Sequence, residues 1–128
     1  MNNRCIVISN NNELVRLIPS RVVYVMSDGN YSTFVLHDKT EQVFTMNLAR
    51  CQQTIEQQLG KEANIFIRIG KRLIINKNYI FKVNISKQEL WMSNMDKNMA
   101  FKLSAYELVV GCRVELVDTL NNVVCCPL

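Results

Sequence analysis

Hydrophobic and polar positions alternate along most of the chain, in short runs that end at turn-forming residues. Alternation with a period of two predicts β-strands, because successive side chains of a strand point to opposite faces. Such runs occupy residues 4–8, 13–18, 22–26, 31–36, 41–45, 65–69, 73–75, 79–85, 89–93 and 99–103. The run 22–26 is almost wholly apolar, which predicts a strand buried on both faces.

Turn signals join the early runs into hairpins. Polar residues 9–12 separate the first two runs, and Ser27-Asp28-Gly29-Asn30 separates the third from the fourth. Asp-Gly and Gly-Asn supply the positive φ angles that tight hairpins require. Later in the chain, the run 79–85 predicts a strand with Tyr79, Phe81 and Val83 on one side.

One segment has the period of an α-helix instead. Its apolar residues are Leu48, Cys51, Ile55 and Leu59, which fall on one face. Asn47 is suited to cap the start of this helix, and Gly60 is suited to end it. A second helix is predicted from Ser104, because Glu107 follows at the spacing of a capping box.

Length and composition indicate one domain. The chain has 128 residues, of which 48% are hydrophobic and 20% charged. We expect a single domain over 1–128, with an N-terminal β-hairpin (1–19), a core (20–120) and a tail (121–128). No apolar run approaches the ~20 residues of a membrane span, and no signal-peptide core fits the N-terminus. A cytoplasmic protein without membrane insertion is therefore expected.

Cysteine and histidine content argues against a metal site. The five cysteines are an odd number without C-x-x-C spacing, and His37 is the single histidine. This pattern favours reduced thiols used as small apolar residues over a disulfide framework or a zinc site. No G-x-S-x-G or H-E-x-x-H motif occurs, and Gly60-Lys61 and Gly70-Lys71 lack the spacing of a phosphate-binding loop. We expect neither an enzyme nor a cofactor.

Charge is concentrated in the middle of the chain. Residues 61–87 contain seven basic residues and one acid, a net charge of +6, although the whole chain carries only +4. A basic segment on a slightly acidic body indicates a polyanionic partner, nucleic acid first, or a solvated face whose cations are incidental.

Three clusters of residues have side chains suited to nucleic acid. They are residues 28–32, residues 68–72 with 76–78 close behind, and residues 102–106. Amides and hydroxyls bind base edges or phosphates, cations bind phosphates, and a helix start offers free amides. Each cluster also fits an ordinary turn or a helix cap. The candidate contact residues are Asn30, Tyr31 and Ser32; Arg68, Lys71, Arg72, Asn76 and Lys77; and Ser104 and Tyr106.

These clusters, in this order, resemble the LytTR DNA-binding domain, the output module of many bacterial response regulators. Residues 22–31 (VVYVMSDGNY) resemble the opening strand and loop of that family, and residues 102–104 (KLS) resemble its third loop. Residues 66–80 (FIRIGKRLIINKNYI) resemble its most specific stretch, F-x-R-I-x-x-x-x-I-V-N-x-x-x-I. The resemblance covers about residues 20–120.

The resemblance implies a mostly β fold, an elongated stack of small, mainly antiparallel sheets with one short scaffold helix. It also implies a transcriptional regulator that binds double-stranded DNA sequence-specifically, through loops that read successive grooves. By position, Asn30 and Tyr31 fall in one major-groove loop, and Lys71 and Arg72 in a central minor-groove loop. Asn76 would tie the backbone of the central loop. Ser104 and Tyr106 fall in the other major-groove loop. The expected partners are DNA and a second copy on direct repeats. A separate sensor or regulatory chain is expected if the chain is an output domain, and none if it is a free-standing regulator.

The sequence departs from the family pattern in three places, which together comprise four residues. Gly70 stands where histidine is frequent, Arg72 where serine is frequent, and Ala105-Tyr106 where arginine is usual. Arginine is the best bidentate partner for guanine, so base readout by the third loop is left open. The alternative is a protein-interaction module that keeps the fold without specific base readout. Three methionines near a loop favour it mildly, namely Met92, Met95 and Met99.

Overall fold

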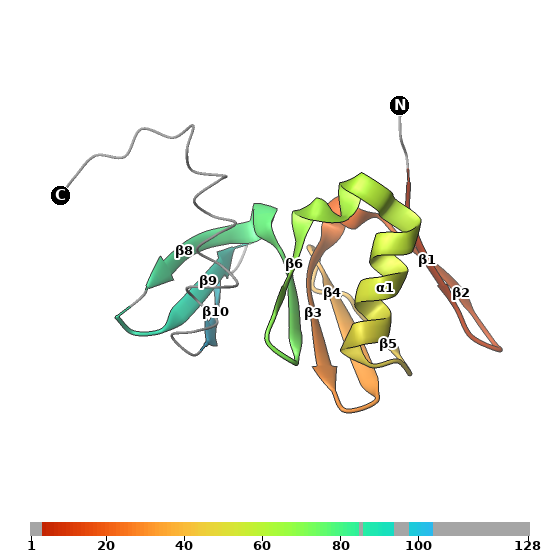
Figure 1. Ribbon diagram of the computed structural model, residues 1–128, viewed down its shortest axis with the longest axis horizontal. Helices are drawn as coiled ribbons and strands as arrows, with labels where there is room; N and C mark the ends of the chain where they lie inside the picture. Colours follow the sequence, from red (N-terminus) through yellow and green to blue (C-terminus); the bar gives the residue numbers. More distant parts are fainter. Residues whose placement is uncertain (1–3, 85, 94–97, 104–128) are drawn as a thin grey trace.

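The computed structural model describes residues 4–84, 86–93 and 98–103. In these residues ten strands form three antiparallel sheets beside one α-helix (Figure 1). The strands are β1 (Ile6–Ser9), β2 (Leu14–Leu17), β3 (Val22–Asp28), β4 (Tyr31–Leu36), β5 (Glu41–Phe44), β6 (Phe66–Ile69), β7 (Leu73–Asn76), β8 (Ile80–Asn84), β9 (Glu89–Ser93) and β10 (Asn98–Lys102). The helix is α1 (Leu48–Leu59), and three 3-10 segments are η1 (Pro19–Arg21), η2 (Gly60–Ile65) and η3 (Lys77–Tyr79). The expected mostly β stack with one scaffold helix is confirmed.

The central layer is a five-stranded sheet in the order β5-β4-β3-β7-β6. One of its faces packs on α1 and the β1–β2 hairpin, and the other packs on the three-stranded sheet β10-β9-β8 (Figure 1). Each of these two faces of the central sheet has its own apolar core. Phe34 and Ile55 belong to the first core, and Ile75 and Leu90 belong to the second. Burial on both faces explains the nearly continuous apolar runs of β3 and β7.

The helix α1 forms as its sequence predicts. The Asn47 side chain accepts a hydrogen bond from the Arg50 backbone N–H at 2.8 Å, and Gly60 follows the last helical residue with a positive φ of 59°. The four residues of its predicted apolar face, 48, 51, 55 and 59, are all buried in the first core. Burial raises the pKa of the Cys51 thiol, in keeping with a small apolar role for this cysteine.

The side-chain pattern of β8 differs from the expected alternation. A β-bulge between Ile80 and Lys82 adds one residue to this strand relative to β9. As a result Ile80 and Val83 both pack on the second core, whereas the Phe81 side chain is 58% exposed. The expectation that Phe81 and Val83 share one side was therefore wrong.

Several expectations fall outside the described residues. These are the helix predicted from Ser104 and the tail 121–128. The division of the chain into hairpin, core and tail stays a prediction. Within 4–84, 86–93 and 98–103, no helix has the length and hydrophobicity needed to cross a membrane.

Candidate nucleic-acid interface

Two of the three candidate clusters lie side by side at one end of the central sheet. Strands β3 and β7 are antiparallel neighbours, with Met26 opposite Leu73, and the Ser27 backbone N–H donates to the Arg72 carbonyl at 2.8 Å. The β3–β4 turn (29–30) and the β6–β7 turn (70–72) therefore share one edge of the molecule, the lower edge in Figure 1. We call this the turn edge. A single flat or convex partner can reach both turns at once.

The β3–β4 hairpin ends in a loop of two residues. Asp28 pairs with Tyr31, and Gly29 between them has a φ of 64°, a conformation that favours glycine. Asn30 is exposed and the Tyr31 side chain is 57% exposed, so both face solvent at the tip. The hairpin therefore presents an amide and a phenol beyond the sheet.

Ser32 has a different place from its two neighbours in this cluster. Its side chain is fully buried, and its hydroxyl lies 2.5 Å from the Ser27 hydroxyl. The Ser32 hydroxyl also donates to the Met46 carbonyl at 2.7 Å, which ties the hairpin to the segment before α1. Ser32 thus anchors the hairpin one residue pair behind its tip, and its side chain is absent from the hairpin surface.

The β6–β7 turn carries the exposed cations of the second cluster. Gly70 has a φ of 66°, and Lys71 and Arg72 after it are exposed. Behind them, the half-buried Arg68 donates from Nε to the Gly70 carbonyl at 3.0 Å and from Nη1 to Gln52 Oε1 at 3.1 Å. Arg68 therefore braces the turn from the α1 side and holds its shape.

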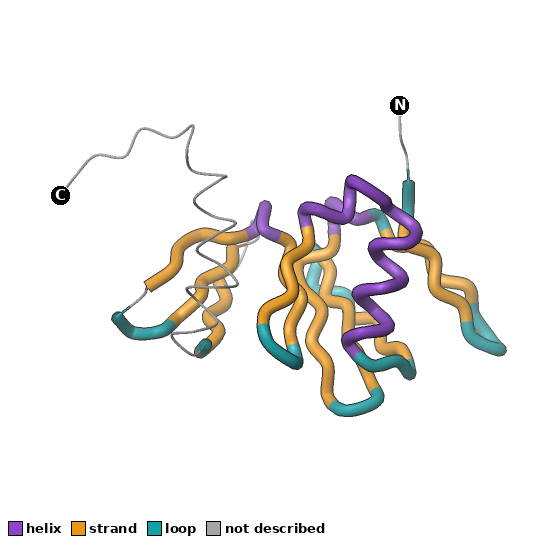
Figure 2. The backbone as a smooth tube through the Cα atoms, in the orientation of Figure 1, coloured by secondary structure: helices purple, strands orange, loops and turns teal. Residues whose placement is uncertain are grey.

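Asn76 and Lys77 lie away from the turn edge. Asn76 is fully buried: its Nδ2 donates to the Val22 carbonyl at 2.9 Å, and its Oδ1 accepts from the Asn78 N–H at 3.0 Å. It ties η3 to β3 and does not touch the β6–β7 turn. Lys77 follows the far end of β7, roughly 16 Å from Arg72 at ~3.3 Å per residue. Figure 2 shows η3 at the upper end of the molecule.

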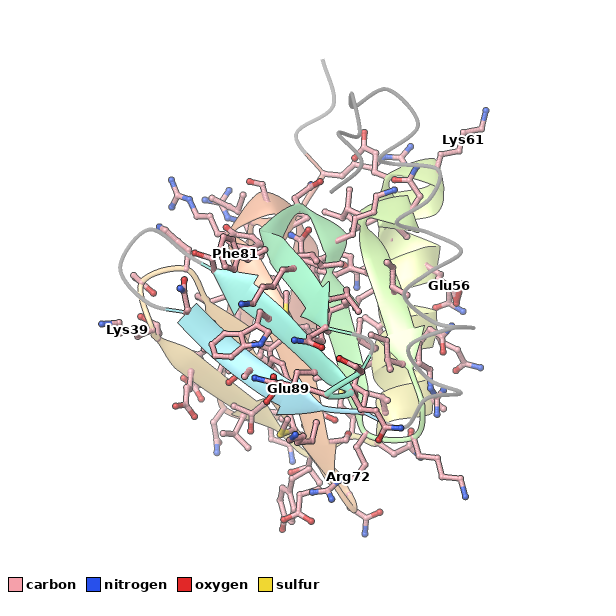
Figure 3. All side chains as sticks on the ribbon, turned by 90° about the vertical axis from the view of Figure 1, so that its left-hand side faces the viewer. Lys39, Glu56, Lys61, Arg72, Phe81 and Glu89 are labelled. Atoms are coloured by element: carbon pink, nitrogen blue, oxygen red, sulfur yellow. The ribbon has the colours of Figure 1, made fainter. Side chains whose placement is uncertain are left out.

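The basic segment of the sequence is accordingly divided in space. Lys61 lies at the upper end and Arg72 at the lower end in Figure 3. Lys82 lies on the outer face of the three-stranded sheet, with its Nζ 5.0 Å from the centre of the Trp91 ring. Only part of the +6 charge is available to a partner at the turn edge.

The third cluster begins at the end of β10, which also lies at the turn edge (Figure 1). The Lys102 Nζ is 3.4 Å from Glu89 Oε2 and donates to the Lys87 carbonyl at 3.1 Å. Ser104 and Tyr106 lie outside the described residues. Lys87 is exposed here. Sequence reasoning did not single out the Lys102–Glu89 ion pair, because it joins residues 13 positions apart that only the pairing of β9 with β10 brings together.

Glu89 is held by two neighbours. Partial desolvation raises the pKa of its carboxyl, but the hydrogen bond from Trp91 Nε1 at 3.3 Å and the charge of Lys102 outweigh it. The net result is a pKa below the ordinary value of 4.5. The charged form is therefore the one that the folded protein favours.

A pH titration of tryptophan fluorescence tests this arrangement, because Trp91 is the only tryptophan in the chain. A lowered pKa means that the Glu89 contacts are intact at neutral pH and are lost as the pH falls through the folded-state pKa. We expect a fluorescence transition with its midpoint below 4.5. The transition should be absent in Glu89→Gln; its persistence there would show that another group reports on Trp91.

Comparison with known proteins identifies the family of this chain and finds a solved structure with a similar fold. A family model described as the LytTr DNA-binding domain matches residues 12–108. Among solved structures, the chain is similar to the LytTr DNA-binding domain of a protein from Bacillus cereus described as a methyl-accepting/DNA response regulator. The TM-score is 0.61 and the identity 16%, over 90% of this chain and 98% of that one. No curated protein matches the chain significantly. Since the family model covers most of the chain, this protein belongs to the LytTr DNA-binding domain family.

Proposed function

We propose that this protein is a transcriptional regulator that binds double-stranded DNA sequence-specifically through its turn edge. The family consists of DNA-binding domains and is not a catalytic one. The observation that carries the proposal is the hydrogen bond between Ser27 and Arg72, since it holds the two turns next to each other on one surface.

The spacing of the two turns suits neighbouring grooves. Adjacent strands are ~4.8 Å apart, so two hairpin tips that occupy four consecutive strands are centred about 10 Å from each other. The midlines of a ~12 Å major groove and a ~6 Å minor groove that share one backbone are about 9 Å apart. We infer that the tip with Tyr31 enters a major groove, and that Lys71 and Arg72 follow the adjacent minor groove.

The charges of the turn edge support phosphate binding. Its described cations are Lys71 and Arg72 at the β6–β7 turn, and Lys102, which is paired with Glu89, with Lys87 next to it. Of its acids, Glu89 is occupied by Lys102, which leaves Asp28 at the hairpin tip. Arg68 acts by shaping the turn. In this proposal Ser32, Asn76 and Lys77 do not contact DNA, and Ser104 and Tyr106 supply the second major-groove contact.

A titration with duplex DNA at several salt concentrations tests the proposal. Each phosphate contact adds about −0.9 to the slope of log affinity against log salt, so four or five contacts give a slope of about −4. Fluorescence anisotropy with labelled duplexes measures both affinity and slope. Absence of binding to any duplex at about 50 mM salt would contradict the proposal.

Base readout by the hairpin tip is tested by Asn30→Ala and Tyr31→Phe. Both residues are exposed, so the fold should be unaffected. A good base contact is worth ~1–3 kcal/mol of discrimination, so preference should relax at one or two base positions. Selection of bound sequences from a random duplex pool measures this. An equal loss for all sequences would show that these residues bind only the backbone.

We further propose that two copies bind direct repeats, under the control of a separate sensor or regulatory chain. The similarity to the LytTr domain of a response regulator supports a regulatory chain. The two copies on direct repeats are an expectation from the family resemblance. Sedimentation of the protein with duplexes that carry one or two copies of the selected site gives the test. Two protein molecules are expected on the duplex that carries two sites. One protein molecule on each of the two duplexes would contradict binding to direct repeats.

The alternative of a protein-interaction module loses part of its support. Met92 is fully buried, and Met99 packs on the second core. Met95 lies outside the described residues. The side chains of Met92 and Met99 are therefore explained by packing. A stable complex with a protein partner, together with only millimolar DNA affinity, would select the alternative over DNA binding.

A further inference from the structure

A groove of about 350 Å³ lies between α1 and β6, on the side of the central sheet that faces the helix. This volume is at the lower end of the range for small-molecule sites, ~300–1,000 Å³. Its floor is apolar and is formed by Ile55, Ala63, Phe66 and Ile74. Of these, Ala63 and Phe66 are only half-buried, so they offer apolar surface to an occupant.

Polar side chains surround this floor. Arg68 and Lys61 bring two positive charges, Glu56 brings one negative charge, and Gln52 is neutral. In Figure 3, Glu56 and Lys61 both project outward, away from the sheets. Arg68 is half-buried and lies two residues after Phe66 on β6, so the two side chains share one face of the strand, whereas Glu56 and Lys61 are exposed. The groove therefore combines an apolar body with a cationic end.

Arg68 also links this groove to the turn edge. Its guanidinium holds Gln52 Oε1 at 3.1 Å and the Gly70 carbonyl at 3.0 Å. A carboxylate prefers two parallel N–H bonds from one guanidinium, and such charge-assisted bonds are stronger than bonds to neutral acceptors. An anion in the groove would therefore compete with the Gly70 carbonyl for Arg68 and release the β6–β7 turn.

We propose that this groove binds a small amphipathic carboxylate, and that the bound ligand weakens DNA binding by drawing Arg68 away from the β6–β7 turn. The ligand places its apolar body on Phe66 and Ala63 and its carboxylate on Arg68. The proposal has two halves. The regulatory half, that the ligand weakens DNA binding, rests on the proposed DNA-binding function. The binding half, that the groove takes up the carboxylate, does not.

Binding is tested on the full chain without DNA, with 2-naphthoate as the probe and equilibrium dialysis read by naphthoate fluorescence. Half-saturation is expected below about 1 mM for a ligand of this size, and the neutral analogue 2-naphthamide should bind at least tenfold more weakly. The variant Gln52→Glu places a competing carboxylate beside Arg68 and should weaken naphthoate binding at least tenfold. No saturable binding, or equal binding of the acid and the amide, would overturn the proposal.

A matched control separates the site from general charge effects. Gln53→Glu makes the same charge change on the next residue of α1, which is exposed and does not line the groove. Its naphthoate affinity should stay within about twofold of wild type. An equal loss in Gln53→Glu and Gln52→Glu would place the ligand elsewhere and overturn the proposal.

The link to DNA is tested with the variant Ala63→Leu, which fills the groove. Naphthoate should lower the duplex affinity of the wild type severalfold and leave that of Ala63→Leu unchanged. Naphthoate binding with no change in duplex affinity would overturn the regulatory half. A chain that binds naphthoate but no duplex would instead overturn the proposed function, and the dialysis result would still support the groove as a carboxylate site.

Discussion

The double substitution of Lys71 and Arg72 by alanine is expected to weaken binding to every duplex by about 60-fold at 0.1 M salt. Affinity varies with salt to the power of about −0.9 for each phosphate contact, so each lost contact costs roughly eightfold at this concentration. Because phosphates carry no sequence information, the loss should be the same for all sequences. The salt slope should become less negative by about 1.8. Fluorescence anisotropy with several unrelated duplexes measures all three quantities.

The matched control removes two other cations of the same basic segment. Lys61→Ala and Lys77→Ala together change the net charge by the same amount, but these residues lie at the end of the molecule opposite the β6–β7 turn. Lys61 and Lys77 lie farther from DNA bound at the turn edge than the ~10 Å screening length. Their removal should therefore lower the affinity for DNA by no more than about threefold. A loss as large as that of the Lys71 and Arg72 variant would mean that DNA binds by net charge and not by the turn edge.

The substitution Asn76→Ala is expected to lower the free energy of unfolding by about 2–4 kcal/mol. The Asn76 side chain satisfies the Val22 carbonyl at 2.9 Å and the Asn78 N–H at 3.0 Å in a fully buried position. Alanine leaves these groups without their partner, at ~1–3 kcal/mol for each buried polar group, and leaves a small cavity. Denaturant unfolding followed by Trp91 fluorescence measures the change.

The same experiment distinguishes a structural role of Asn76 from DNA contact. Asn78→Ala is the control, because the Asn78 side chain is exposed and its backbone N–H is retained; it should change stability by less than about 0.5 kcal/mol. Folded Asn76→Ala protein should bind duplex DNA within about twofold of wild type. Unchanged stability together with lost DNA binding would show that Asn76 contacts DNA after all.

The local elements of this fold follow from sequence because their causes are local. The positive φ of Gly29 closes the β3–β4 hairpin, and Asn47 and Gly60 bound α1. The bulge in β8 could not be seen in the same way. The residues around Phe81 alternate well enough for a regular strand, and only pairing with β9 decides which of them is the extra residue.

The site was predicted less completely, because it depends on pairing between distant strands. Tyr31 and Arg72 were both candidates, and β3–β7 pairing across more than 40 residues brings their turns together. Sequence spacing cannot show that the four residues of β7 between Arg72 and Lys77 carry Lys77 to the opposite end of the molecule. Nor does sequence spacing show that the Ser32 hydroxyl donates its hydrogen bond to the Met46 carbonyl. The types of the side chains indicated candidates for binding DNA. Their burial in the folded chain decides which of these candidates a partner can reach.

Mapping of backbone amide shifts by NMR, as one duplex is added to the labelled protein, tests most directly whether a single double helix touches both turns. We expect the amides of Asn30 and Tyr31 to shift together with those of Lys71 and Arg72, with one common midpoint, while Lys61 and Lys77 stay unchanged. Shifts confined to one turn, or centred on Lys61 and Lys77, would contradict binding through the turn edge.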